Sequence, residues 1–269
     1  MPRRFSCSDL IALTGTGAWP VVIDVRREQA YRESGRRIAG SIKRDAGDAA
    51  ARLPALGASR RVVVYCAHGH NVSEIAAAAL AVAGVEVAVL EGGFDAYVRA
   101  GGVTVANDVD GVDVSGRVSV WVTRERPKID RIACPWLIRR FVDPQAVFHF
   151  VAAEWVGDVA SEIGAIPYDV ADVPYSHRGE RCTFDTMIAA FGLADAALDH
   201  LARIVRGADT AMVDLEPEAA GLLALSLGLS ATEPDDLVQL EKGMIIYDAL
   251  YGWCRHAAGE TDNWPARMA

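Results

Sequence analysis

The chain has 269 residues, of which 51% are hydrophobic and 23% charged, and its formal net charge is -9. This length and composition predict two globular domains and exclude a largely disordered chain. No apolar run reaches the roughly 18 residues of a membrane span, and the first residues lack the apolar core of a signal peptide. We therefore expect a cytoplasmic protein that makes no membrane contact.

Charge and cysteine usage narrow the possible partners. Residues 1–110 hold 13 Lys and Arg against 12 Asp and Glu, whereas residues 111–269 hold 14 against 24. An acidic second half disfavours nucleic acid as a partner. The five cysteines are odd in number and include no Cys-x-x-Cys pair, which argues against a disulfide framework and against a thiolate zinc knuckle.

The first half alternates apolar runs with segments of helical pattern. The apolar runs predict strands at 19–26, 40–44, 61–66 and 85–93. The other segments predict helices at 28–35, 48–57, 72–84 and 94–102. Strands that are apolar throughout and alternate with helices are typical of a parallel sheet covered on both faces, so we predict an α/β fold.

A polar, glycine-containing stretch at 106–116 predicts a linker between domains at 1–105 and 117–269. The second domain is predicted to be α-rich α+β, with Pro135 in or near the first turn of a helix and Thr232, Pro234 and Asp235 together marking a helix start. Its predicted strands lie at 118–123 and 146–151, and its helices at 129–141, 183–192, 196–207, 216–228 and 233–259.

Cys66 directly follows the buried strand 61–66 and precedes the alanine-rich helix 72–84. Ligands of open α/β sheets bind at the carboxyl ends of strands. Gly69 permits a tight turn in which backbone N–H groups form an anion-binding nest at the helix N-terminus, and such a site lowers the pKa of a thiol. We interpret Cys66 as a nucleophile that carries sulfur as a persulfide, against the alternative of a small buried hydrophobe.

Three stretches of the first domain resemble single-domain rhodaneses over about residues 5–102: the loop "CAHGHN", the strand "VVIDVR" and the segment "LEGGFDAYVRAGG". The resemblance implies a sulfurtransferase with Cys66 as catalytic residue. It implies no cofactor for this step, a small-molecule sulfur donor such as thiosulfate, and a thiol or cyanide as acceptor. The remaining members of the implied substrate loop are Ala67, His68, Gly69, His70 and Asn71.

The resemblance also shows where this sequence departs from the family. Arg37 and Ala39 stand where rhodaneses usually have histidine and proline, and the loop lacks the Arg or Lys that many members use to hold thiosulfate. Asp24 and Arg26 match the family's Asp-x-Arg, and we expect them to support the loop structurally rather than to react.

The second domain contains long stretches rich in rare residues, notably "DRIACPWLIRRF" and "HRGERC". These resemble the C-terminal domain of the chromate-resistance (ChrB-type) family over about residues 118–258. The resemblance implies a role in chromate resistance, which is often regulatory.

We predict that several side chains of this domain converge on one polar pocket. Two basic residues are three positions apart, "HRGERC" has the pattern of a turn, and an aspartate stands at the end of a predicted helix. Such a pocket suits chromate or another oxyanion, or a metal ion of unknown identity; the alternative is scattered surface charges and a buried thiol. The predicted members are Lys128, Arg131, His177, Cys182 and Asp209.

Two functional interpretations follow. The first is a cysteine-persulfide sulfurtransferase fused to a chromate-resistance domain, acting in sulfur or metal-oxyanion stress. The alternative is a non-enzymatic redox, metal or chromate sensor that uses the rhodanese unit as a docking module.

Overall fold

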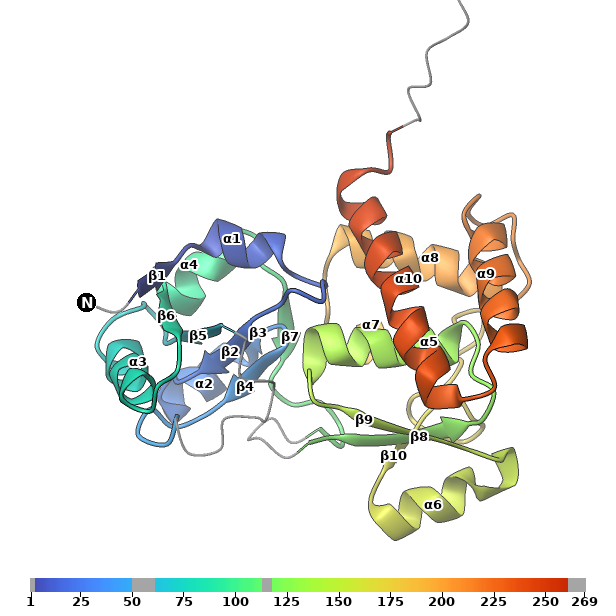
Figure 1. Cartoon of the computed structure of the whole chain (residues 1–269), viewed down its shortest axis with the longest axis horizontal. Helices are drawn as coiled ribbons and strands as arrows, with labels where there is room; N and C mark the ends of the chain where they lie inside the picture. The colour runs from blue at the N-terminus through green and yellow to red at the C-terminus, as the bar shows by residue number, and fades with distance from the viewer. Residues whose placement is uncertain (1–2, 50–60, 113–117, 261–269) are drawn as a thin grey trace, which may run out of the picture.

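A computed structural model describes residues 3–49, 61–112 and 118–260 of the chain. Its two halves lie side by side, the first running from β1 to β7 and the second from β8 to α10 (Figure 1). Within these ranges, no helix is long and apolar enough to span a bilayer. Most of the predicted helix at 48–57 lies outside the described residues.

A five-stranded parallel sheet forms the centre of the first half, with strand order β1-β6-β5-β2-β4. Every residue of β2, β5 and β6 is buried, because helices cover both faces. This confirms the predicted α/β sheet. The strands are β1 (Arg3–Phe5), β2 (Val21–Asp24), β4 (Ser41–Lys43), β5 (Val62–Tyr65) and β6 (Val87–Leu90).

The side chains of β5 alternate between two cores, as the pleat of a strand requires. Val62 and Val64 pack with α3 on one face, whereas Val63 and Tyr65 pack with α1 and α4 on the other. The four helices of this half are α1 (Cys7–Ala12), α2 (Glu28–Ser34), α3 (Val72–Val82) and α4 (Gly93–Arg99).

The second half is α-rich and has a small parallel sheet of order β10-β8-β9, as predicted. One helix, α6, packs on one face of this sheet and the remaining helices form a bundle with the other. The strands are β8 (Val120–Arg124), β9 (Val147–Val151) and β10 (Ile166–Pro167). The helices are α5 (Asp130–Leu137) with a π-helical turn at Ile138–Val142, α6 (Val156–Ile163) after a 3-10 turn at Ala153–Trp155, α7 (Thr183–Ala190), α8 (Ala196–Asp209), α9 (Ala219–Thr232) and α10 (Asp236–His256).

Pro135 lies in the interior of α5, so its predicted place in or near a first turn is wrong. A proline inside a helix leaves the carbonyl four residues earlier without its usual donor. Here that carbonyl belongs to Arg131, and it accepts a hydrogen bond from the Tyr168 hydroxyl at 3.3 Å. A side chain from another segment therefore replaces the missing backbone bond.

The helix start predicted from Thr232, Pro234 and Asp235 needs one correction. Thr232 is the last residue of α9, and Asp235 alone caps α10, its carboxylate accepting the N–H groups of Leu237 and Val238. Thr232 instead donates its hydroxyl to the carbonyl of Gly228 within its own helix.

The two halves meet at a small antiparallel sheet of β3 (Arg36–Ile38) and β7 (Thr104–Ala106). The Arg37 side chain is fully buried there and donates to backbone carbonyls of Ala106 and of Val142 in the second half. Val109 and Val112, within the predicted linker, pack into the core of the second half. The division into two domains stays a prediction.

Candidate functional site

Cys66 lies where β5 ends, and its side chain is buried beside the first turn of α3. Its loop also carries positive-φ residues, Gly69 at 72° and Asn71 at 26°, so the chain turns sharply before α3. The amides of His68, His70 and Ser73 are directed toward the Cys66 sulfur, an arrangement that favours negative charge.

Two glycines allow the backbone of the Cys66 loop to lie close to the start of α4. A Cβ on Gly69 would lie 2.6 Å from the Leu90 carbonyl oxygen, and one on Gly93 would lie 2.3 Å from the carbonyl oxygen of Cys66. Backbone bonds hold the contact, with the N–H of Phe94 donating to the Cys66 carbonyl at 2.9 Å. The "GGF" of the sequence therefore belongs to the same structure as the cysteine loop.

Hydrogen bonds to sulfur decide the acidity of Cys66. Burial raises the pKa of the thiol, but the Ser73 hydroxyl and the amides of Ser73, His68 and His70 outweigh it and hold the pKa below its usual value. The Ser73 Oγ lies 3.3 Å from the sulfur and is itself fully buried. Ser73 was not predicted, since a serine in the first turn of a helix is common and its aim at Cys66 needs the fold.

Asp24 ends the neighbouring strand β2, and Arg26 lies two residues beyond it. Their side chains form a buried ion pair with N···O of 2.6 Å. The Tyr65 hydroxyl donates to Asp24 at 2.8 Å, and the Arg26 guanidinium lies 4.0 Å over the Phe94 ring. The pair thus holds both neighbours of the site, the residue before Cys66 and the first turn of α4.

His68 and His70 differ in their surroundings. The His68 imidazole is largely exposed, and its Nδ1 lies 3.0 Å from a carboxylate oxygen of Asp95. The His70 side chain is exposed, while its carbonyl accepts the Cys66 thiol at 3.2 Å. Both residues therefore lie at the mouth of the loop.

Four segments of the second half bring polar side chains together around His177. The Nε2 of His177 lies 3.5 Å from Asp130, 3.5 Å from Asp169 and 3.2 Å from Asp209. Arg131 joins the group through Asp169, at 3.4 Å. The structure thus brings Arg131, His177 and Asp209 of the predicted pocket together. We call Asp130, Asp169, His177 and Asp209 the His177 cluster.

Of the two other predicted members of the pocket, Lys128 lies apart from the cluster and Cys182 adjoins it. Lys128 precedes α5 rather than lying on it, because the helix begins at Asp130. Its ammonium makes no hydrogen bond or ion pair with any residue that the structure describes. Cys182 is fully buried at the start of α7, where its thiol donates to Asp185 at 3.3 Å. Cys182 therefore adjoins the cluster as a capping residue.

Sequence reasoning missed Asp130 and Asp169 as members of the cluster. Asp130 is the first residue of α5, and Asp169 has a φ of 52°, a conformation in which aspartate is more common than most residues. Both accept hydrogen bonds from Thr183, Asp130 from its N–H at 2.7 Å and Asp169 from its hydroxyl at 2.9 Å. An aspartate next to a predicted helix start was the available signal for Asp130.

Burial and mutual repulsion shape the acidity of the cluster. Burial raises the pKa of Asp130 well above its usual range, and the charges of Asp209 and Asp169 raise it further. Burial and Asp169 likewise raise the pKa of Asp209. Burial also raises the pKa values of Cys134 and Cys182. Cys134 and Cys182 are fully buried, whereas His177 and Asp209 are partly exposed.

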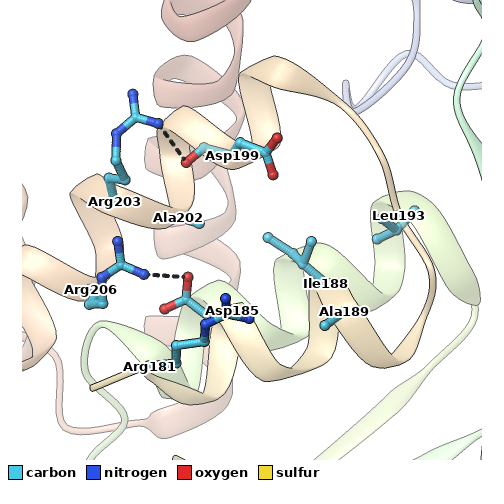
Figure 2. Close-up of a pocket in the computed structure, with 9 residues that line it drawn as sticks. All are labelled: Arg181, Asp185, Ile188, Ala189, Leu193, Asp199, Ala202, Arg203 and Arg206. Atoms are coloured by element: carbon cyan, nitrogen blue, oxygen red, sulfur yellow. Dashed lines mark hydrogen bonds and ion pairs between the residues drawn. The ribbon is translucent and has the colours of Figure 1, made fainter. Parts of the chain in front are cut away.

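A separate cavity of about 350 Å³ lies between α7 and α8, lined by three arginines and two aspartates among apolar side chains (Figure 2). Arg206 pairs with Asp185 across it at 2.9 Å. Arg181 borders this cavity rather than the His177 cluster. Within the "HRGERC" segment, the backbone groups of Arg178 and Arg181 bond to each other and close a turn.

Comparison with known proteins identifies both halves. The family model of the rhodanese-like domain matches residues 6–100. The model of the ChrB C-terminal domain matches residues 121–254. Protein ChrB of Cupriavidus metallidurans is 34% identical over 133 residues, which are 49% of this chain and 39% of that protein. The match thus spans about two fifths of the length of ChrB.

Solved structures match the first half. A rhodanese-related protein from Thermoplasma volcanium is 26% identical, with 37% of this chain and 93% of that chain covered and a TM-score of 0.31. A protein of unknown function from Rhodopseudomonas palustris, described as a possible tyrosine phosphatase, is 28% identical, with 38% and 83% covered and a TM-score of 0.33. The two family models, rather than these structures, carry the assignment: this chain joins a rhodanese-like domain to a ChrB C-terminal domain.

Proposed function

We propose that the first half is a sulfurtransferase and that Cys66 is its persulfide carrier. The Cys66 thiolate attacks the outer sulfur of a donor such as thiosulfate, the S–S bond of the donor breaks, and sulfite leaves with the bonding electron pair. A thiolate or cyanide acceptor then attacks the outer sulfur of the persulfide, and the Cys66 thiolate is released.

One observation carries this proposal: the backbone amides of His68, His70 and Ser73 are directed toward the Cys66 sulfur, and the Ser73 Oγ lies 3.3 Å from it. These donors stabilise the attacking thiolate and also the anionic persulfide that replaces it. A cysteine that served only as a buried hydrophobe would not need them. The histidines at the loop mouth, instead of Arg or Lys, favour a donor other than thiosulfate, such as a small-molecule persulfide.

The experiment is to treat the full chain with one equivalent of thiosulfate or glutathione persulfide and to measure its mass. The expected product is one sulfur atom heavier, carries the sulfur on Cys66, and returns to the original mass with cyanide. Cys66→Ser is expected to form no such adduct, while Cys7→Ser, which changes a partly exposed cysteine, should form it normally. A cyanide-labile sulfur on the Cys66→Ser variant would overturn the proposal.

We further propose that the activity belongs to the cytoplasm and serves resistance to chromate or related oxyanion stress. All five cysteines are free, which suits a reducing compartment. The ChrB likeness of the second half supports the link to chromate. The acidic charge of that half supports small molecules or ions, rather than nucleic acid, as its partners.

A further inference from the structure

The three carboxylates of the His177 cluster surround a single imidazole nitrogen. Each has an oxygen 3.2 to 3.5 Å from Nε2 of His177. One N–H can donate to one acceptor at a time, and charge-assisted bonds of this kind are usually about 2.7–2.9 Å long. Hydrogen bonding by His177 therefore does not explain why three carboxylates surround Nε2, each at a distance longer than that of a charge-assisted hydrogen bond.

Among the described residues, arginine ion pairs reach only one carboxylate of the cluster. Asp169 is paired with Arg124 at 3.2 Å and Arg131 at 3.4 Å. Asp130 and Asp209 have no Arg or Lys ion pair anywhere in the described ranges, and His177 is their shared partner. The Asp130 side chain is 1% exposed and that of Asp209 is 18% exposed, and a cation between them would stabilise both as anions.

Asp130 supplies an independent sign of a missing ligand. Its side chain is 1% exposed and points into the cluster, yet its Oδ1 has no hydrogen-bond partner among the described residues. A buried carboxylate oxygen without a partner is costly, and native structures rarely keep one without a role.

The spacing of the three groups fits a metal ion. Ligand atoms of Asp130, His177 and Asp209 all lie within 4.8 Å of one another, and the two aspartates contact Nε2 at 3.5 and 3.2 Å. Around a cation with bonds of about 2.1 Å, neighbouring ligand atoms are roughly 3.0–3.4 Å apart in octahedral or tetrahedral geometry. The ligand atoms of Asp130, His177 and Asp209 are therefore spaced nearly as three neighbouring ligands of one metal ion would be.

We propose that Asp130, His177 and Asp209 bind a divalent first-row transition-metal cation of the Mn²⁺, Fe²⁺ or Zn²⁺ class. One imidazole and two carboxylates suit these ions, whereas Ca²⁺ prefers six or more oxygens. Cys134 and Cys182 are fully buried beside the site, and the Cys182 thiol donates to Asp185 at 3.3 Å. The His177 side chain is 41% exposed, so the ion is open to solvent on one side.

The test is metal binding by the full chain after treatment with a chelator. Mn²⁺ is the primary probe because thiolates bind it weakly, and its free concentration is measured by electron paramagnetic resonance; Zn²⁺ is then added as a competitor. One equivalent of Mn²⁺ is expected per chain. His177→Ala and Asp209→Asn should each weaken binding at least about 100-fold.

His200→Ala is the matched control, since His200, Glu216 and Glu218 form a second group of possible ligands. This variant should bind Mn²⁺ like the wild type. Asp209→Asn keeps the shape of the side chain, so it decides the matter if His177→Ala fails to fold. Three outcomes would overturn the proposal: no stoichiometric binding of Mn²⁺ or Zn²⁺ by the wild type, unchanged binding by Asp209→Asn, or loss of binding in the His200→Ala variant alone. None of them bears on sulfur transfer at Cys66.

Discussion

The Cys66 loop and the His177 cluster create opposite electrostatic environments. At Cys66, N–H and O–H donors converge on one sulfur and lower the pKa of its thiol. At His177, carboxylate oxygens converge on one nitrogen, and crowding with burial raises the pKa of two of the acids. Donors stabilise an anion and carboxylates attract a cation, so the two sites present opposite electrostatic environments.

Both sites nevertheless lie at the start of a helix that follows a parallel strand. Cys66 follows β5 and precedes α3, and Asp130 lies between β8 and α5 as the first residue of the helix. The difference comes from what faces the helix start, which is a curled loop of amides in one case and side chains from three other segments in the other. A helix start alone therefore does not define the ligand.

The largest expected effect separates the two sites completely. Cys66→Ser should lower sulfur transfer by about three orders of magnitude, because a serine hydroxyl is a far weaker nucleophile toward sulfur than a thiolate. The same variant should bind Mn²⁺ normally, and His177→Ala should do the reverse. Sulfurtransferase assays and metal titrations on both variants check this, and one variant losing both properties would contradict the separation.

A second prediction concerns the boundary between the regions. Arg37→Met keeps much of the side-chain volume but leaves the buried carbonyls of Ala106 and Val142 without their donor. We expect a loss of about 3 kcal/mol in the free energy of unfolding. Urea unfolding measures it, and Arg32→Ala, which breaks an exposed pair with Glu28, is the control expected to change little. Equal stability of the two variants would contradict this role of Arg37.

A third prediction sharpens the electrostatics of the thiol. Ser73→Ala removes a polar partner that favours the thiolate, so the pKa of Cys66 should rise. The rate of alkylation by iodoacetamide, measured against pH, should then reach its midpoint at higher pH than in the wild type. A midpoint that stays in place would mean that the amides alone set the acidity.

The smallest expected effect lies in the metal-free His177 cluster. The raised pKa of Asp209 means that folding disfavours its ionised form, so the native state loses stability above that pKa and regains it as pH falls through it. Asp209→Asn should therefore stabilise the chelator-treated protein at neutral pH by about 1 kcal/mol. Thermal unfolding should show this gain shrinking as the pH falls, and a gain that is independent of pH would point to packing instead.

More of the Cys66 site than of the His177 cluster could be predicted from the sequence. Cys66 and its loop are contiguous, and Asp24 and Arg26 lie at the end of another strand whose apolar run is equally clear, so local pattern suffices. The His177 cluster combines segments about 80 residues apart, from Asp130 to Asp209. Arg131, His177 and Asp209 were predicted by their chemistry, but Asp169 depends on an unusual backbone angle and on tertiary contacts that no local period reveals.

Arg37 and Ala39 were visible in the sequence only as departures from the rhodanese pattern. In the structure both lie against the second half, Arg37 through its bond to Val142 and Ala39 within the second half's core. Both departures from the rhodanese motif therefore lie where the first half contacts the second half. Their role could be recognised only once the structure of the second half was known.

The burial of Arg37 has a consequence for how the chain can be divided. Its guanidinium joins backbone groups from both sides of the boundary, and the N–H of Gly40 adds a further bond to the Phe141 carbonyl. We therefore expect these non-covalent contacts to hold the two halves together even without the peptide link between them. If residues 1–112 and 118–269 are produced as separate polypeptides in the same cell, they should purify as one complex, and a rhodanese-like domain transplanted from another protein should fail to replace the native one.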